Sequence, residues 1–383
     1  LERYTLLAND LPGVKVRTIL APSESTAGAA KLTMQANQQL NDWYAGANNF
    51  NAEVLGREQM VGGIHANGYL PGSQTGLRGV MSFCVHRFKY FAFSHKQQLN
   101  SQGLGFDGSV SNTNTNPNFD SLDLVYLQTP GQAFILNGNF IYPFIRSRQK
   151  NLNFSAGFNY LNSHTSYYGV ELFNDATRSI NAKIAYNFLL ADQSMNTLEA
   201  GIYQGLNILN AHASPPTIIG GKTNFSKITG SASRYQKLPA KNCYLLIWAK
   251  GQYSFTKELS SEKFGFGGAP FGYGYDPSVI TGDHGYALKL EPQYNINFKM
   301  QYMPYLQMFG FFDTGSVWNL SGENQPEHQS ATSMGAGVRT ILIKRFNIEL
   351  IVAKPFNVYA TNNDKNNTRV MFNAYYSGGT IFG

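Results

Sequence analysis

The sequence predicts an all-β protein, a transmembrane antiparallel β-barrel of about 16 strands that follows the end of a small soluble domain. Three observations lead to this fold class. Apolar and polar residues alternate over long runs, and these runs are longer than the strands of soluble proteins. Charged residues make up only 14% of the chain, while aromatic residues also reach 14%. Ordinary soluble domains carry roughly 25% charged residues.

Residues 1–37 differ from the rest of the chain. Apolar residues recur at helical spacing over 1–7, and the Pro-Gly pair at 12–13 ends this helix. Two strands are expected at 14–20 and 30–36, joined by a loop. One helix and two strands are too little for a stable domain. We therefore expect this segment to be the last part of a larger soluble module.

From residue 38 onward the pattern is that of strands. In the stretch 151–162, NLNFSAGFNYLN, apolar side chains alternate with Asn, Ser and Gly. Successive side chains of a strand point to opposite faces, so such a run gives one apolar face and one polar face. The same alternation recurs at 178–188, 196–206, 285–299 and 345–354. The run 242–255 is an exception, because it is apolar on both faces.

Strand length favours a membrane barrel over a large soluble β-sandwich. The runs extend to roughly ten residues or more, whereas soluble strands average about 5 or 6 and tilted membrane strands need ~9 to 11. A sandwich would have to cover all of these apolar faces with one another. Strands cross a bilayer only in a closed barrel, since an open edge leaves backbone groups unpaired. Roughly 345 residues at about 20 per strand and loop give about 16 strands.

Several kinds of function are not supported. The net charge of +7 is modest and the basic residues are scattered, so no nucleic-acid surface is predicted. Cys84 and Cys243 show no metal-ligand spacing and are either lone thiols or one bridge. No sequence motif marks a catalytic residue, a metal site or a cofactor site, although a Ser/His/Asp site assembled on a barrel wall would leave no such motif.

The glycine-rich segment 265–286 is the most unusual part of the chain. It lacks the Gly-Lys-Ser/Thr ending of a phosphate-binding loop, and no helix is expected after it. It is too long for a tight hairpin and lies between two strong strands. Long loops of unusual composition are commonly functional.

This segment contains a Glu-x-Phe motif, a Gly-Gly pair, a glycine-rich tip, a Gly-Asp-x-Gly motif and a final Glu. The positions are Glu262, Phe264, Gly267, Gly268, Gly274, Tyr275, Gly282, Asp283, Gly285 and Glu291. The combination resembles the two-partner secretion transporters, the TpsB or haemolysin activator/secretion family of the Omp85 superfamily. The Phe-x-Asp-x-Gly motif at 311–315, the Tyr-Pro segment at 142–147 and the segment 1–23 are similar to the corresponding parts of that family.

The resemblance implies two domains. Residues 1–37 would be the C-terminal part of a POTRA domain, the periplasmic module of the family. Residues 38–383 would be an outer-membrane β-barrel in which a long loop at about 265–285 folds into the lumen. The implied loop-lock residues are Gly272, Tyr273, Gly274, Tyr275, Asp283 and Gly285. The implied lumen-wall residues are Phe311, Asp313, Gly315, Lys289, Glu291, Arg339 and Glu349.

The loop tip departs from the family pattern. In the family, an Arg at the tip pairs with the Asp of the strand motif, whereas this chain has Tyr273 in place of that Arg. We expect the Tyr273 phenol to donate one hydrogen bond to Asp313, which gives a weaker lock than a guanidinium would. Alternation places Asp313 on the inner face. The expected cation beside it is Arg339, on the next strand. Outside this context, the Gly and Tyr residues would be interpreted as ordinary turn residues.

The implied function is export of a large exoprotein from the periplasm to the surface of a Gram-negative bacterium, through the barrel lumen and without ATP. The POTRA module would capture the client by strand addition. The expected partners are this exoprotein and outer-membrane lipid, including lipopolysaccharide. No nucleic acid is expected, and the chain is expected to be a monomer. Two alternatives stay open: an Omp85 insertase that uses the seam between the first and last strands, and a passive porin.

Overall fold

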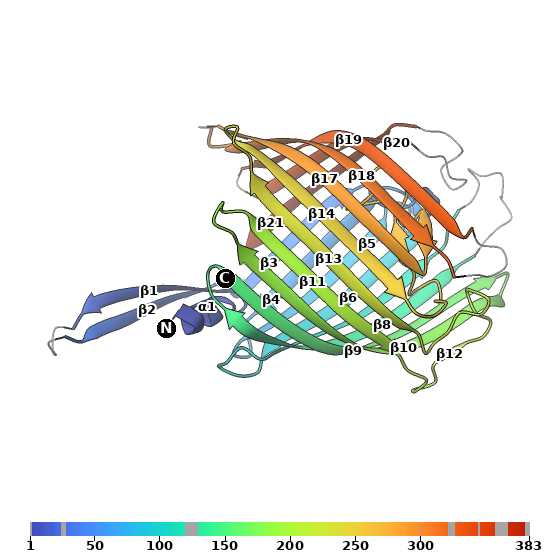
Figure 1. The fold of residues 1–383 in the computed structure, drawn as a ribbon, viewed down its shortest axis with the longest axis horizontal. Coiled ribbons are helices and arrows are strands. Elements are labelled where there is room, and N and C mark those ends of the chain that lie inside the picture. The colour runs from blue at the N-terminus through green and yellow to red at the C-terminus, as the bar shows by residue number, and fades with distance from the viewer. Residues whose placement is uncertain are drawn as a thin grey trace.

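The protein is described by a computed structural model that covers residues 2–23, 28–118, 129–298, 300–320, 326–343, 345–356 and 367–379. The described residues form one short α-helix, a 3-10 turn (Glu53–Leu55) and many antiparallel strands (Figure 1). No helix among them is long and apolar enough to cross a membrane. The two cysteines, Cys84 and Cys243, are both free thiols.

A closed barrel of 16 long antiparallel strands dominates the structure, and this confirms the predicted fold class. The strands are β3 (Asn41–Asn48), β4 (Gln59–Asn67), β5 (Ser73–Ser82), β6 (Phe88–Gln98), β7 (Gly105–Thr115), β8 (Gly131–Arg146), β9 (Lys150–Tyr167), β10 (Val170–Leu189), β11 (Met195–Gly205), β13 (Ser226–Lys237), β14 (Cys243–Ser254), β17 (His284–Asn297), β18 (Tyr305–Trp318), β19 (His328–Leu342), β20 (Phe346–Pro355) and β21 (Arg369–Gly379). The two-residue strand β12 (His212–Ala213) pairs with β10. The barrel closes where β21 pairs with β3, from Asn373 opposite Asn48 to Gly379 opposite Asp42.

The alternation of the sequence becomes the two faces of the barrel wall. Large apolar side chains on the outer face are exposed, as Phe91, Phe93, Ile180 and Ile184 illustrate. Because they lie on the outside of a closed barrel and not against a second sheet, the sandwich alternative is wrong. Within the described residues, the last strand β21 extends to Gly379.

The two ends of the barrel differ in the length of their connections. At the end that holds both chain termini (Figure 1), strands are joined by short turns such as 68–72 and 147–149. At the opposite end they are joined by longer segments such as 206–225 and 255–283. Outer-membrane barrels have short periplasmic turns and long extracellular loops, so in such a barrel the end with the short turns would be the periplasmic end.

The N-terminal segment lies at the end with the short turns. It contains α1 (Glu2–Asn9) and the hairpin of β1 (Val14–Pro22) and β2 (Ala30–Gln38), which are the elements expected from sequence. The guanidinium of Arg146 on β8 lies 2.6 Å from the Asp10 carboxylate after the helix. Arg3 donates to the carbonyl oxygen of Pro143 at 2.7 Å. These contacts hold the helix against the mouth of the barrel.

Candidate functional site

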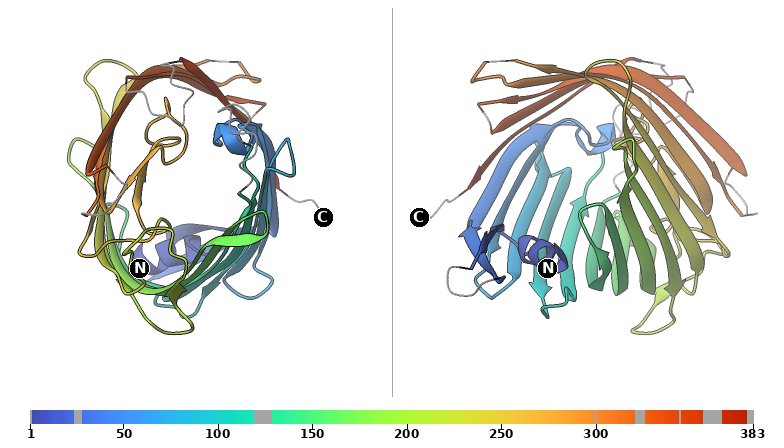
Figure 2. Two further views of the ribbon diagram at one scale, coloured as in Figure 1. Left: turned by 90° about the vertical axis from the view of Figure 1, so that its right-hand side faces the viewer. Right: turned by 60° about the vertical axis from the view of Figure 1, so that its left-hand side comes forward.

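The long loop 255–283 connects β14 to β17 and folds back into the barrel. Within it, β15 (Phe264–Phe266) and β16 (Ile280–Gly282) form a small antiparallel hairpin. The left view of Figure 2 looks along the barrel and shows this segment inside the ring of strands. The long loop is the candidate functional site, because it fills space that a passive channel would leave to water.

Glycines on the inner wall leave space for the aromatic side chains of the hairpin. A Cβ atom on Gly315 would lie 2.3 Å from the ring of Phe266, and one on Gly285 would lie 2.4 Å from the ring of Phe264. Only residues without a side chain leave room for these rings. Both phenylalanines are buried, in one cluster with Phe271, Tyr275 and neighbouring apolar residues of the wall. The motif glycines therefore act as sockets for the aromatic residues of the loop.

The tip of the loop contacts Asp313 through its backbone. Gly267, Gly268 and Gly272 have positive φ angles of 124°, 74° and 91°, and they make the tight turns that bring the tip to the wall. The N–H groups of Gly272 and Tyr273 donate to Asp313 Oδ2 at 3.0 and 3.4 Å. The expectation of a hydrogen bond from the phenol is corrected here, because the backbone amides occupy the carboxylate oxygen.

The cation beside Asp313 is Lys289, not Arg339. Lys289 Nζ lies 3.6 Å from Asp313 Oδ1 and 3.9 Å from the centroid of the Tyr273 ring. Lys289 and Asp313 are opposite each other on β17 and β18, and both are buried. A desolvated cation over an aromatic face is attracted by about 2 kcal/mol. Tyr273 thus contacts the Lys289–Asp313 pair with its ring face instead of its hydroxyl group.

Arg339 faces the lumen but has different partners. Its Nη1 and Nε atoms each lie 2.6 Å from a carboxylate oxygen, one of Glu291 and one of Glu349. Glu291 also accepts a hydrogen bond from Gln293 at 2.8 Å. The expectation that Arg339 balances Asp313 is wrong because these two glutamates hold the guanidinium.

A second ion pair links the loop to the last strand. The Asp276 carboxylate lies 2.9 Å from Arg369 Nη1 on β21, although the angle falls outside hydrogen-bond geometry. Asp276 also accepts from the N–H group of Glu53 at 3.3 Å. Asp276 and Arg369 are 7% and 9% exposed. Sequence reasoning missed this pair, in which the loop carries the acid and the wall carries the base.

Two other motif residues fix the tip against β19. The hydroxyl group of Tyr275 donates to the carbonyl oxygen of Thr332 at 2.7 Å. The N–H group of Gly274 donates to Ser333 Oγ at 3.4 Å. A Cβ atom on Gly274 would lie 2.8 Å from Ser333 Cβ and 2.9 Å from the backbone nitrogen of Pro355, so a side chain fits here only if the tip shifts slightly from the wall.

The root of the loop, where it joins β14 and β17, is held by buried charged residues. Asp283, which is fully buried, accepts from the N–H groups of Glu258 and Leu320, both at 2.8 Å. The ammonium group of Lys227 on β13 lies 2.9 Å from Glu262 and 3.6 Å from Glu258. Burial raises the pKa of Glu258 to about 8, although the Lys227 charge opposes this rise.

The site is suited to mechanical retention of a loop. Its contacts are aromatic rings in glycine sockets, backbone amides on a carboxylate, and ion pairs between loop and wall. Among the described residues, no group of three or more His, Cys, Asp or Glu side chains could hold a metal ion.

Comparison with known proteins agrees with this architecture. The model of the haemolysin secretion/activation protein family ShlB/FhaC/HecB matches residues 106–340, more than half of the 383 residues. A search of curated proteins finds no match. CdiB from Escherichia coli superposes with a TM-score of 0.83 at 16% identity, covering 97% of this chain and 69% of that one.

Two further solved structures share the fold. CdiB from Acinetobacter baumannii gives a TM-score of 0.74 at 14% identity, over 97% of this chain and 67% of that one. BamA from Haemophilus ducreyi lacking POTRA domains 1-3 gives 0.64 at 12% identity, over 95% and 75%. These likenesses show the barrel fold, and the family match shows the function. The chain belongs to the ShlB/FhaC/HecB family of two-partner secretion, and it is a non-enzymatic transporter of the Gram-negative outer membrane that secretes an exoprotein partner.

Proposed function

We propose that the exoprotein crosses through the barrel lumen and that the long loop 255–283 is a plug that must leave its seat during export. The observation that carries this proposal is the set of contacts between the loop tip and the inner wall, above all Asp276 with Arg369 and the tip amides with Asp313. Each of these contacts can be released separately, and water can then solvate the charged groups.

The lumen wall supports this path. Its inward-facing charged residues form ion pairs with one another, so no charge of the client is needed to balance them. These residues are Lys289, Glu291, Arg339, Glu349 and Asp313. In this proposal, Phe311 and Gly315 line the seat of the loop, where the Tyr273 ring lies 5.1 Å from the Phe311 ring.

We further propose that residues 1–37 are the end of a POTRA domain that receives the client, that lipid surrounds a monomeric barrel, and that 38–383 form the membrane domain. The exposed apolar outer face supports contact with lipid. A deletion strain separates this role from that of an insertase. Loss of one exoprotein alone supports export, whereas a general loss of outer-membrane proteins contradicts it.

Disulfide tethers test the movement of the loop. The pair Gly274→Cys and Ser333→Cys joins the tip to β19, where the two Cβ positions are 2.8 Å apart. The pair Gly265→Cys and Ser278→Cys is a matched control within the loop, with Cβ positions 3.0 Å apart. Both distances are below the usual ~3.8 Å of a disulfide, so each pair needs a shift of about 1 Å. The shift at Gly274 also has to move the tip away from the Pro355 backbone nitrogen, which lies 2.9 Å from the new Cβ atom.

Both tethers are made in a background in which Cys84 and Cys243 are replaced by Ser. We expect the tip-to-wall tether to stop secretion of the exoprotein until a reductant is added. The control tether should leave secretion intact, because the loop can still move as a unit. Full secretion with an oxidised tip-to-wall tether would show that the plug does not have to move.

A further inference from the structure

The outer face of the barrel carries a groove that runs across the strands from β17 to β21. Its floor is a row of small outward-facing residues: Pro292, Gly310, Ala336, Val352 and Val370. Gly310 lies opposite Ala336, Ala336 opposite Val352, and Val352 opposite Val370 in the strand register. A Cβ atom on Gly310 would lie 3.9 Å from the Pro292 ring, which places these two residues side by side.

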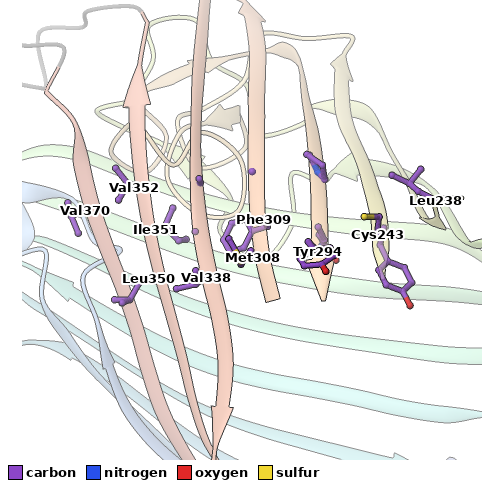
Figure 3. Close-up of a pocket in the computed structure, with 16 residues that line it drawn as sticks. Leu238, Cys243, Tyr294, Met308, Phe309, Val338, Leu350, Ile351, Val352 and Val370 are labelled. Carbon is purple, nitrogen blue, oxygen red and sulfur yellow. The ribbon is translucent and has the colours of Figure 1, made fainter. Parts of the chain in front are cut away.

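Rows of larger side chains form the two edges of the groove. The edge toward the periplasm consists of Tyr294, Met308, Val338 and Leu350. The edge toward the cell surface consists of Leu290, Phe312, Met334 and Lys354. Figure 3 shows the side chains of Met308, Val338, Leu350, Val352 and Val370 around this hollow.

Two adjoining hollows make up the groove. The first has a volume of about 730 Å³ and extends to Leu238 and Tyr244. The second has a volume of about 590 Å³ and extends to Lys354 and Thr368. They share Pro292, Gly310, Ala336 and Val352 as lining residues. The floor is continuous, so a long flexible chain fits it better than a rigid ring system.

Proline at this position agrees with an occupant made of hydrocarbon. Pro292 lies within β17, and its nitrogen carries no hydrogen. The register of β17 with β18 passes from Leu290 opposite Phe312 to Gln293 opposite Phe309 without an assigned pair between them. A backbone N–H group without a hydrogen-bond partner would be costly at this position in lipid, and proline has no such group.

Lys354 gives the groove a polar end. It is the one charged residue among the described residues that line the two hollows, and it is exposed on the outer face. No carboxylate lies within ion-pair distance of it in the part of the chain that the structure describes. It is the penultimate residue of β20, at the long-loop end and therefore toward the outer leaflet. An ammonium group there matches the phosphate group of an anionic lipid.

We propose that this groove binds lipopolysaccharide, with an acyl chain along the floor of small residues and a lipid phosphate at Lys354. Lipopolysaccharide is the phosphorylated, multiply acylated lipid of the outer leaflet, the leaflet that Lys354 faces. The groove lies on the opposite side of the wall from the long loop, so this site is independent of the path that the exoprotein takes.

The test measures the lipopolysaccharide retained by the purified, full-length protein in detergent, by mass spectrometry and by rebinding after delipidation. Gly310→Leu fills the floor, where the nearest atoms to a new Cβ lie 3.8 and 3.9 Å away, so the backbone is not disturbed. Lys354→Gln removes the charge. Gly62→Leu on β4, where a new Cβ lies 3.7 Å from its nearest neighbour, and Lys89→Gln on β6 are matched controls outside the groove.

We expect Gly310→Leu to reduce rebinding on the order of tenfold, since several methylene contacts are lost. Lys354→Gln should reduce it about fivefold. The two controls should bind as the unmodified protein does. Resistance of each barrel to unfolding in detergent without heating, together with secretion of the exoprotein, shows that the variants are folded.

Three results would overturn the proposal. One is equal loss of lipid in the control variants, which would indicate general contact with the bilayer. Another is unchanged binding in both groove variants. The third is preferential rebinding of phosphatidylglycerol vesicles over lipopolysaccharide, which would assign the groove to an ordinary phospholipid.

Discussion

Replacement of Arg369 by Met tests how strongly the loop is held in the barrel. Unit charges 2.9 Å apart attract by about 6 kcal/mol at an effective dielectric constant of ~20, before desolvation is subtracted. Removal of one partner of a buried pair typically costs ~3 to 5 kcal/mol, because the other charge is left uncompensated. We expect a cost at the lower end of this range, because Asp276 still accepts a hydrogen bond from the N–H group of Glu53 at 3.3 Å. When the loop opens, water solvates Asp276 instead.

Arg369→Met should therefore shift the balance from closed to open loop by about 3 kcal/mol, which is a factor of more than ~100. The assay is ionic conductance of the purified protein in planar bilayers, with the open fraction recorded over time. The double variant Arg369→Met with Asp276→Asn has no unpaired charge and should return most of the closed state. An open fraction that is unchanged in the single variant, or equal in single and double variants, would refute the argument.

Three further predictions concern the seat and the root of the loop. Gly315→Ala puts a methyl group about where the Phe266 ring lies, 2.3 Å from its nearest atom, so we expect an unseated loop and high conductance. Tyr275→Phe removes two hydrogen bonds, the one that its hydroxyl group donates to the Thr332 carbonyl oxygen and the longer one that it accepts from the Thr332 N–H group, and should lower the stability of the closed loop by about 1 to 2 kcal/mol, measured as a modest rise in open fraction. Burial raises the pKa of Glu258 to about 8, and a carboxyl group whose pKa is raised by closure destabilises the closed loop increasingly as pH rises toward that value. The open fraction should therefore rise from about pH 5 to about pH 8, and Glu258→Gln should remove this part of the pH dependence.

Each of these predictions has a contrary outcome. Gly310→Ala is the matched control for the glycine socket, since it faces outward and its new Cβ atom would make only ordinary contacts at 3.8 and 3.9 Å; equal conductance in both glycine variants would exclude the socket. A Tyr275→Phe variant that closes as tightly as the unmodified protein would mean that water replaces the lost hydroxyl group. An unchanged pH profile in Glu258→Gln would assign the titration to another group.

The fold followed from sequence because the period of two depends only on which face each side chain takes. The run 242–255 broke this rule for a physical reason. It forms β14, and its inward Trp248 packs on Phe271 of the long loop, with ring centroids 4.7 Å apart. The inner face is apolar at Trp248 because this residue contacts the loop and not water, whereas Lys250 and Gln252 on the same face are polar. An apolar inner face in such a strand therefore indicates where something is seated.

The contacts of the loop tip were harder to predict. The motif located the loop and Asp313, but the donors to Asp313 are backbone amides, which every residue except proline carries. Lys289 was assigned only to the lumen wall, because nothing in the sequence indicated which side chain lies opposite Asp313. The register of β17 with β18 supplied that pairing. Arg369 is the first residue of the last strand and belongs to no motif, and only the closed barrel brings it to Asp276.

The Asp276–Arg369 pair places the acid on the loop and the base on the wall, and this limits how loop and barrel can be exchanged with those of relatives. Its loop presents a carboxylate to the barrel, and the barrel already supplies the ammonium group of Lys289 and the guanidinium of Arg369. A grafted loop with arginine at its tip would bring a further positive charge beside Lys289, which already pairs with Asp313. Loop and barrel are thus a matched set, and a functional chimaera has to exchange both together.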